Sequence, residues 1–488
     1  MITKIKGKYV IAYDGKSHVI IENGEVVFKD DTIIYVGKNY EGKFDEYIEE
    51  MSSIISPGFI DLDALGDIDH ALIFNEVNPD KRKNLYWSEE YFDSFRKEYM
   101  TEEEENFKSL YAYAQLISNG ITTAMPITSV NYKKSAETFK EIETAAHHAG
   151  RLGLRVYLGP SYVSGMHVID DKDCLKVKWM LEEGRVGLAR AEEFIKKYDG
   201  MYGGLINGVM VPERVELQTE DILKESKKIS KKFNCPIRLH AAQGEFEYKS
   251  IYNKTGMSTV KYLDSIGFLD ENTLIPHTIY SSGHKYLEDG SNDDQEILKS
   301  RGTTVIHCPL VYARSGQALD SFGRYKRIGV NLAMGTDTFP PDMIRNINIG
   351  STLGLHQDEG KSDNNFSEFF TAATIGGSKA LGRNDLGRLS VGAKADIIVI
   401  DLSGFHIGTI DDPIRTICLS GSGRDVKTSI INGKIVMQDY IIPGLEYNEL
   451  RDKAQKYYEK MKEGYVYRSK NKSIEGFYTN SFPKVNSI

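Results

Sequence analysis

Eight runs of strand-forming residues alternate with helical segments along the middle of this chain. Several runs are almost continuously apolar, which is typical of parallel strands buried on both faces. Eight strand–helix units predict an α/β fold, a (β/α)8 TIM barrel, whose active site lies at the carboxyl ends of the strands. The predicted strands are Ile54–Asp63, Thr122–Ser129, Leu154–Tyr162, Gly208–Pro212, Pro236–Ala241, Thr273–Tyr280, Thr303–Pro309 and Val330–Asp337.

The two ends of the chain carry further β segments outside this repeat. Strand-like stretches in residues 1–53 are separated by turn signals such as Asn23-Gly24, and residues 385–440 return to β. We predict that the two sets pair into a small composite β-sandwich, because their edges need partners. Residues 54–384 then form the barrel. Residues 441–488 form a charged helix and an aromatic tail that packs on the barrel or on a partner subunit.

Composition and charge exclude several classes of partner. The 488 residues carry a formal net charge of −9, which argues against a broad nucleic-acid-binding surface. No run approaches the roughly 20 apolar residues of a membrane-spanning helix, and the first residues lack the apolar stretch of a signal peptide. The four cysteines are scattered, which fits a reducing compartment. We expect a cytoplasmic protein that acts on a small molecule, without nucleic-acid or membrane partners.

Three of the predicted strands end in residues that can do chemistry. The fifth strand ends at His240, the sixth at His277 and the eighth at Asp337. A single histidine on an apolar strand is more often a structural residue. Two histidines and an aspartate at the same end of one barrel are less easily explained as structural residues, so they predict a shared site.

Several segments resemble the amidohydrolase superfamily in order and spacing, over about residues 1–440. The segments are Pro57-Gly58-Phe59-Ile60-Asp61, His240, His277, His307-Cys308-Pro309, Gly335-Thr336-Asp337 and Ala373 to Gly382, followed by Asp385-Leu386-Gly387 and Ala395-Asp396. The resemblance is to the cytosine deaminase-like and triazine chlorohydrolase-like branch. It implies one metal ion, bound by two histidines of the first strand, the histidine of the fifth and the aspartate of the eighth, with a bound water as the attacking group.

The resemblance assigns roles to residues of this chain. It implies that His240 and Asp337 are metal ligands, that Asp337 is also the catalytic base, and that His277 polarises the attacked group. Two positions depart from the family. The two histidines of the first strand are replaced by Asp63 and Leu65, and Leu65 cannot bind a metal.

The second departure is the proton-shuttling glutamate, which is replaced by Gln243. An amide does not transfer a proton near neutral pH. Glu245, two residues further on, either takes over that role or is a solvated residue favoured at a helix start. Gln243 therefore weakens deamination as the reaction, since expelling ammonia benefits from a proton donor.

Asp63 is the direct substitute for the missing ligands, and Asp67, Asp69 and His70 follow closely. The alternative for Asp67 and Asp69 is capping of the next helix. A site with more oxygen ligands binds zinc less tightly and favours manganese or iron. We expect one divalent ion per chain, with zinc first and manganese or iron as alternatives. Metal-free chemistry by Asp337 and His277 is left open.

Other polar residues follow the predicted strands and are candidates for substrate binding. These are Tyr162, Tyr280, His307 and Arg314. Arg314 either meets an anionic substrate group through a two-point contact or forms a surface ion pair. Trp87, in the long loop after the first strand, either covers the pocket or packs in the core.

Two functions compete. The first is a hydrolase that attacks a non-peptide C–N bond, or a related C–X bond, of a small nitrogen-containing ring, with ring opening or displacement of a good leaving group favoured. The alternative is an altered or inactive relative that keeps the barrel and binds a ligand, since fold does not imply activity. The aromatic tail and the habit of the family favour a homodimer.

Overall fold

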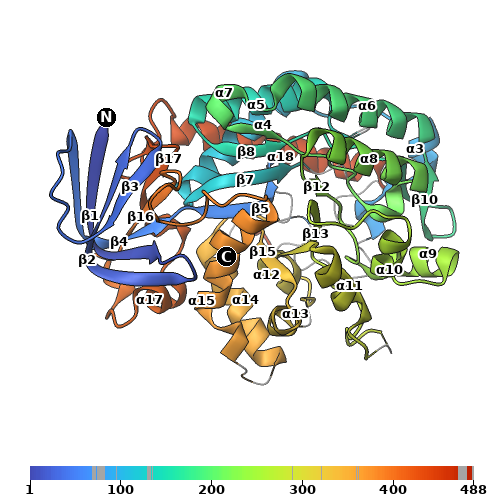
Figure 1. Ribbon diagram of the computed structural model, residues 1–488. Helices are drawn as coiled ribbons and strands as arrows, with labels where there is room; N and C mark the ends of the chain where they lie inside the picture. The colour runs from blue at the N-terminus through green and yellow to red at the C-terminus, as the bar shows by residue number, and fades with distance from the viewer. Residues whose placement is uncertain are drawn as a thin grey trace.

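The computed structural model shows a protein that combines parallel sheets, mixed sheets and many helices (Figure 1). It describes residues 1–68, 73, 83–94, 96–128, 133, 136–287, 290–319, 321–358, 360, 362–470 and 481–485. Asp69 and His70, two of the predicted substitute ligands, lie outside the described residues.

Eight short parallel strands form two four-stranded sheets, ordered β11-β8-β7-β5 and β12-β13-β14-β15. Each predicted strand overlaps an observed one in the predicted order, but every observed strand is shorter, and the predicted Gly208–Pro212 shares only Gly208 with the observed strand. Their bounds are β5 Phe59–Leu65, β7 Ile121–Ile127, β8 Arg155–Leu158, β11 Ile206–Gly208, β12 Ile237–Arg238, β13 Thr273–Pro276, β14 Thr304–His307 and β15 Asn331–Met334.

Backbone hydrogen bonds join these two sheets on both sides. On one side Arg238 N donates to Met210 O, and Met210 N donates to Pro236 O, both at 3.0 Å. On the other side Asp337 N donates to Asp63 O at 2.8 Å. The second contact places the end of β5, the first of the eight strands, beside the loop that follows the last.

The apolar run predicted as one strand, Ile54–Asp63, is two strands. β4 (Glu46–Pro57) belongs to a mixed seven-stranded sheet, and the chain enters β5 after Gly58. A Cβ atom at Gly58 would lie 2.1 Å from Thr122 Cγ2, so only glycine fits where the chain crosses between sheets. Both strands are buried there, and hydrophobic periodicity alone therefore does not reveal the break.

Both ends of the chain contribute to a single seven-stranded sheet, ordered β18-β17-β16-β4-β1-β2-β3. β4 pairs with β1 from the N-terminal end and with β16 from the C-terminal end. The Asn23-Gly24 turn was a wrong prediction, because both residues lie inside β2. The second layer of the predicted sandwich stays a prediction. The other bounds are β1 Ile2–Tyr13, β2 His18–Lys29, β3 Thr32–Gly37, β16 Ile397–Asp401, β17 Val426–Ile431 and β18 Lys434–Met437.

Helices surround the parallel sheets (Figure 1). Thr101 and Thr138 begin α4 and α5 with capping boxes, in which each threonine side chain and a glutamate three residues later satisfy exposed backbone N–H groups. The longer helices are α4 Glu102–Ser118, α5 Phe139–Leu152, α6 Leu181–Tyr198, α8 Glu220–Phe233, α9 Glu245–Thr255, α11 Asp293–Arg301, α14 Met343–Gln357 and α18 Tyr447–Arg468. Shorter ones include α10 Thr259–Ser265, α12 Pro309–Ala313, α13 Phe322–Ile328, α15 Phe366–Thr371 and α17 Pro413–Ser420.

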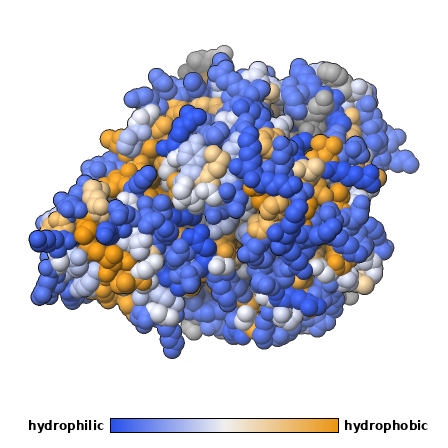
Figure 2. Space-filling model, turned by 45° about the horizontal axis from the view of Figure 1, so that its top comes forward, coloured by the Kyte–Doolittle hydropathy of each residue, from blue (hydrophilic) through white to orange (hydrophobic). Residues whose placement is uncertain are grey.

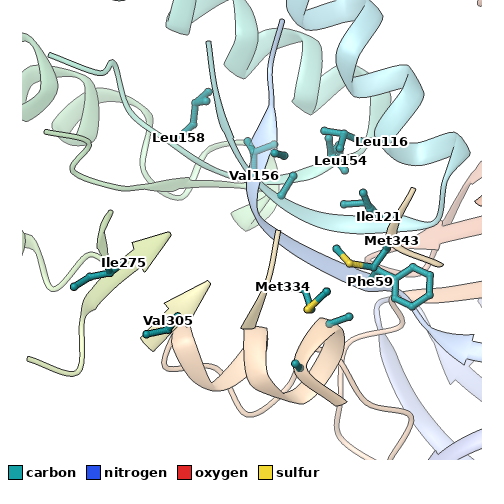
Figure 3. Packing of buried hydrophobic residues seen from close by; sticks show 14 of the residues in the cluster. Phe59, Leu116, Ile121, Leu154, Val156, Leu158, Ile275, Val305, Met334 and Met343 are labelled. Atoms are coloured by element: carbon teal, nitrogen blue, oxygen red, sulfur yellow. The ribbon is translucent and has the colours of Figure 1, made fainter. Parts of the chain in front are cut away.

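One hydrophobic cluster links the strands of both parallel sheets to the helices outside them (Figure 3). Val156 of β8, Ile275 of β13 and Met334 of β15 are completely buried in it, together with Leu116 of α4 and Met343 of α14. Full burial of such side chains stabilises a fold by roughly 1.5–3 kcal/mol each. The cluster therefore holds the strand ends, and the side chains they carry, in fixed positions.

The C-terminal helix α18 packs on the segment that follows β5. Met461 and Tyr465 are buried against Ile68 and Leu85. Arg468, also buried, donates to Leu85 O at 2.8 Å. Residues near the end of the chain thus cover residues that follow β5.

Among the described residues, no helix is long and apolar enough to cross a membrane. The view in Figure 2 shows a face on which hydrophilic side chains predominate, with apolar patches between them. The four cysteines are all free thiols, as their scattered positions in the sequence predicted.

Candidate active site and metal centre

Three side chains from three different strand ends converge on one point. Asp63 comes from β5, His240 follows β12 and His277 follows β13, and one potential ligand atom of each lies within 4.8 Å of the others. His240 Nε2 is 3.6 Å from Asp63 Oδ1, and His277 Nε2 is 3.6 Å from Asp63 Oδ2. Two ligands bound tetrahedrally to one transition metal at about 2.1 Å lie about 3.4 Å apart. The observed spacing fits a single ion.

Two buried polar atoms of this group form ion pairs but none of the hydrogen bonds that buried polar groups normally make. In the described part of the chain, neither Asp63 Oδ1 nor His277 Nε2 has a hydrogen-bond partner. His240 Nδ1 is held at 2.9 Å by the backbone oxygen of Glu213, which leaves Nε2 facing Asp63. A histidine whose second nitrogen is fixed by a carbonyl is typical of metal sites. The residues therefore fit a metal ion.

Asp337 lies at the edge of this group. Its Oδ2 atom is 3.6 Å from His277 Nε2, and its side chain is 20% exposed, whereas Asp63 and His277 are fully buried. Asp337 has φ 43° and His277 has φ 70°, a left-handed region that residues other than glycine rarely adopt. Such backbone strain gathers at functional sites, where the surrounding structure holds it in place.

A local irregularity in β5 also orients the Asp63 side chain. The register of β5 against β7 shifts between Asp61 and Ala64, and a bulge of this kind redirects side chains next to active sites. Asp61 itself is fixed elsewhere, because it accepts hydrogen bonds from the backbone and side chain of Thr336 at 3.0 and 2.6 Å. Burial raises the pKa of Asp61 to about 6. Asp61 thus fastens β5 to the loop that follows β15.

Arg238 is a member of the site that the sequence did not predict. Its side chain is completely buried, and Nη1 lies 3.2 Å from Asp63 Oδ1. The guanidinium also donates to the backbone oxygens of Leu62 at 3.1 Å and Met125 at 2.5 Å. Burial opposes ionisation of Asp63, but His240 and Arg238 outweigh it and hold the pKa of Asp63 below its usual value. Asp63 is therefore an anion, ready to act as a ligand.

Gln243 and Glu245 have different surroundings. Gln243 is hydrogen-bonded through its side chain to Arg214 and to Tyr312. Glu245 is exposed at the start of α9 and pairs with Lys249 at 2.6 Å. The geometry matches the solvated interpretation of Glu245, and a displaced proton shuttle at this position finds no support in it.

Two of the predicted substrate-binding residues lie on loops around the site. Tyr280 is buried, and its backbone N donates to Ala242 O at 2.7 Å, beside the loop that carries His240. Arg314, at the end of α12, donates to Thr338 Oγ1 at 2.6 Å, next to Asp337. Both remain candidates for contact with a substrate.

The other two lie among the outer helices. The Tyr162 hydroxyl donates to Ser226 Oγ of α8 at 2.6 Å. The ring of His307 lies 5.9 Å from the rings of both Phe322 and Phe369, on α13 and α15, and burial lowers its pKa to about 3. The structure does not bring Tyr162 and His307 to the site, because their side chains point to the helical layer.

Two further residues from the segment after β5 also have other partners. Asp67 is buried and its Oδ2 atom lies 3.5 Å from Lys108 Nζ, an ion pair with α4. Trp87 is buried and stacks on Tyr91, with ring centroids 5.7 Å apart. Of the two interpretations of Trp87, the structure shows packing.

Comparison with known proteins identifies the class. Residues 54–436 match the model of the Amidohydrolase family, and the chain belongs to that family. The family resemblance that the sequence predicted is therefore confirmed, and with it an amidohydrolase-type hydrolase.

Two similar proteins are deaminases. The chain is 26% identical to the 5-methylthioadenosine/S-adenosylhomocysteine deaminase of Pyrococcus abyssi, over 89% of this chain and 94% of that protein. It is 25% identical to the 5'-deoxyadenosine deaminase of Methanosarcina mazei, over 93% and 96% respectively.

Solved structures agree in fold. An adenosine deaminase from Xanthomonas campestris with bound zinc has a TM-score of 0.75 at 16% identity, covering 94% of this chain and 98% of that one. An atrazine chlorohydrolase from Arthrobacter aurescens complexed with zinc has a TM-score of 0.76 at 15% identity, covering 93% and 100%. At this level of identity the likeness concerns the fold.

Proposed function

We propose that this protein hydrolyses a C–N bond of a small nitrogen heterocycle, at the carboxyl ends of the strands of a (β/α)8 barrel. The observation that carries the proposal is the convergence of Asp63, His240 and His277, with Asp337 beside them. The hydrogen bonds that join the two parallel sheets on both sides support the barrel.

One divalent metal ion, with zinc as the first candidate, would be held by Asp63, His240 and His277. When bound, such an ion lowers the pKa of a water molecule so that hydroxide forms near neutral pH. The zinc in the two solved neighbours supports this choice. Manganese and iron are the alternatives, because a carboxylate replaces a histidine in the ligand set.

Asp337 would take the proton of the attacking water. Its carboxylate is partly exposed and lies next to His277, so it can reach both the site and solvent. Arg238 would keep Asp63 ionised throughout. These assignments differ from those that the family resemblance implies, since His277 becomes a ligand and Asp337 acts chiefly as the base.

The substrate we propose is a 6-aminopurine nucleoside modified at its 5' position, which would lose its amino group as ammonia. The names of two relatives, each aligned over most of this chain, support this class. The sequence favoured a better leaving group than ammonia, because Gln243 offers no transferable proton. Another donor must therefore serve the substrate.

The test combines metal analysis with an activity assay. Protein purified without chelators should contain about one equivalent of metal per chain. It should release ammonia from 5'-deoxyadenosine, methylthioadenosine or S-adenosylhomocysteine, and the activity should vanish with a chelator and return with zinc. Metal-loaded protein that leaves all three nucleosides unchanged would overturn the proposed substrate class.

A second candidate function is ligand binding without turnover. The buried Arg238 cation, 3.2 Å from Asp63 Oδ1, favours it, because a guanidinium there already neutralises the carboxylate. This alternative predicts metal-free protein that binds a nucleoside and does not change it. Calorimetry on protein treated with a chelator separates the two.

Two expectations about the whole molecule stay proposals. We propose a homodimer, which light scattering on the purified protein would test, and a cytoplasmic location, which the four free thiols support.

A further inference from the structure

Three side chains form a chain of hydrogen bonds across the mouth of the site. Arg214 Nη1 donates to Gln243 Oε1, and Gln243 Nε2 donates to the Tyr312 hydroxyl. The Tyr312 ring lies against His277, with ring centroids 4.6 Å apart. Arg214 follows β11, Gln243 follows β12 and Tyr312 lies on α12 after β14, so three loops contribute.

The chemistry of these groups determines which atom donates and which accepts in each of these hydrogen bonds. A guanidinium has only donors, so the atom of Gln243 that faces Arg214 must be its oxygen. The amide nitrogen then faces Tyr312, and the phenolic oxygen accepts. The hydroxyl hydrogen of Tyr312 must therefore point elsewhere. In the described part of the chain, Gln243 is the only hydrogen-bond partner of that hydroxyl.

The first two members of the chain are held in place from behind. Arg214 Nε donates to Glu213 Oε1 at 3.1 Å, and the backbone oxygen of Glu213 holds His240. The backbone N of Gln243 donates to Glu247 at 2.6 Å. The same loops thus position a candidate metal ligand and the hydrogen-bond chain, and a donor fixed in advance is what charge stabilisation requires.

We propose that Tyr312 donates a hydrogen bond to the substrate, and that Arg214 and Gln243 aim it. Its target is the ring nitrogen that gains negative charge when water attacks the neighbouring carbon. The inference rests on the proposed function and extends it. Gln243, at the position of the family's proton-shuttling glutamate, becomes a positioning residue, and the donor is supplied from α12.

A positioning role for Gln243 and a simple loss of the proton shuttle predict opposite effects of Gln243→Glu on activity. In Gln243→Glu the carboxylate has only acceptors, so it would accept from Arg214 and also from Tyr312. The Tyr312 hydrogen would then turn away from the substrate. Restoring the family residue should therefore lower activity, whereas a lost shuttle predicts that it raises activity.

The experiment compares Tyr312→Phe, Gln243→Glu and the control Glu245→Gln, all loaded with zinc, using 5'-deoxyadenosine. We expect Tyr312→Phe and Gln243→Glu to lower kcat by about 100-fold, as loss of one donor to a developing charge does, with metal content unchanged. Glu245→Gln, an exposed change two residues away, should leave kcat and KM unaltered. Higher kcat in Gln243→Glu, or wild-type kcat in Tyr312→Phe, would overturn the inference.

Binding separates this inference from the proposed reaction. Calorimetry with the same nucleoside should show weaker binding to both variants than to the wild type. If the wild type binds the nucleoside without releasing ammonia, and both variants bind it about tenfold more weakly, the inference holds and the proposed reaction fails. If the wild type releases ammonia and the variants match it, the reaction holds and the inference fails.

Discussion

The two parallel sheets contribute unequally to the site. The sheet of β5, β7, β8 and β11 supplies one member of the candidate metal group, Asp63. The sheet of β12 to β15, with the loops that follow its strands, supplies His240, His277, Asp337 and Tyr312. Leu65, at the position of a family histidine, lies in the sheet that supplies fewer of these side chains. The second departure from the family, Gln243, follows β12 in the other sheet.

The polar residues near the first sheet are mainly engaged with each other. Asp67 pairs with Lys108 at 3.5 Å, and Lys133 pairs with Glu141 at 2.5 Å and with Glu105 at 3.7 Å. Near the second sheet, His277 is buried with neither ring nitrogen hydrogen-bonded within the described residues. Buried pairs that satisfy each other hold a fold together, whereas buried groups that make no hydrogen bond point to a ligand.

Asp63→Asn is the change expected to do most damage, because it removes the anion that the first sheet supplies. Loss of a residue that only supports a metal ligand costs roughly 10- to 100-fold in affinity, and loss of a ligand should cost more. We expect metal-poor, inactive protein, measured by metal analysis and ammonia release.

Asp67→Asn is the matched control, since Asp67 is a buried acid four residues further along and pairs with Lys108. It should keep its metal. If Asp67→Asn lost its metal while Asp63→Asn kept a full equivalent, the result would contradict this assignment. The metal ligand would then be Asp67, in the segment after Asp63.

Arg238→Met tests the connection between the sheets. The guanidinium reaches from β12 to the carbonyls of Leu62 and Met125 and to Asp63, so its loss leaves a buried carboxylate unpaired. Breaking a buried pair in this way costs about 3–5 kcal/mol of unfolding free energy. Urea denaturation without metal should show this loss, and added zinc should restore more stability in the variant than in the wild type. If zinc stabilised both proteins equally, the result would contradict the idea that Arg238 and the metal ion both interact with Asp63.

Glu247→Gln tests how firmly the second sheet holds its loops. Glu247 is buried and accepts from the backbones of Ala242 and Gln243, and burial, followed by the charge of Glu216, raises its pKa to about 7. The folded state therefore keeps a proton that the unfolded chain releases above its ordinary pKa of 4.5. Wild-type stability should fall as pH rises from about 4.5 to 7, by at most about 1.4 kcal/mol per pH unit from this group. The variant should show a flatter curve in urea denaturation across that window.

The strand order and the placing of three candidate site residues at strand ends could be predicted from sequence, because they depend on local patterns. Apolar runs mark buried strands, and the rule that barrel sites lie at strand ends selected His240, His277 and Asp337. Arg238 and Tyr312 were not predicted from the sequence, because their roles depend on partners that are distant along the chain. Arg238 meets a carbonyl 176 positions away, and Tyr312 meets Gln243 across 69 positions. A charged residue inside the apolar run Pro236–Ala241 was the one local signal for Arg238.

Leu65→His is the smallest expected effect, and it sharpens the comparison by returning a ligand to the first sheet. Asp63 and Leu65 are two residues apart on β5, the spacing of the two strand histidines in the family. A histidine at 65 would add a nitrogen ligand beside an anion already neutralised by Arg238. We expect zinc affinity to rise about tenfold, or about 1.4 kcal/mol, in competition with a chelator of known affinity. The same histidine in Asp63→Asn should restore little zinc affinity, because the carboxylate would still be missing. Full recovery of zinc affinity in that double variant would show that the first sheet needs a ligand of any kind and not an anion.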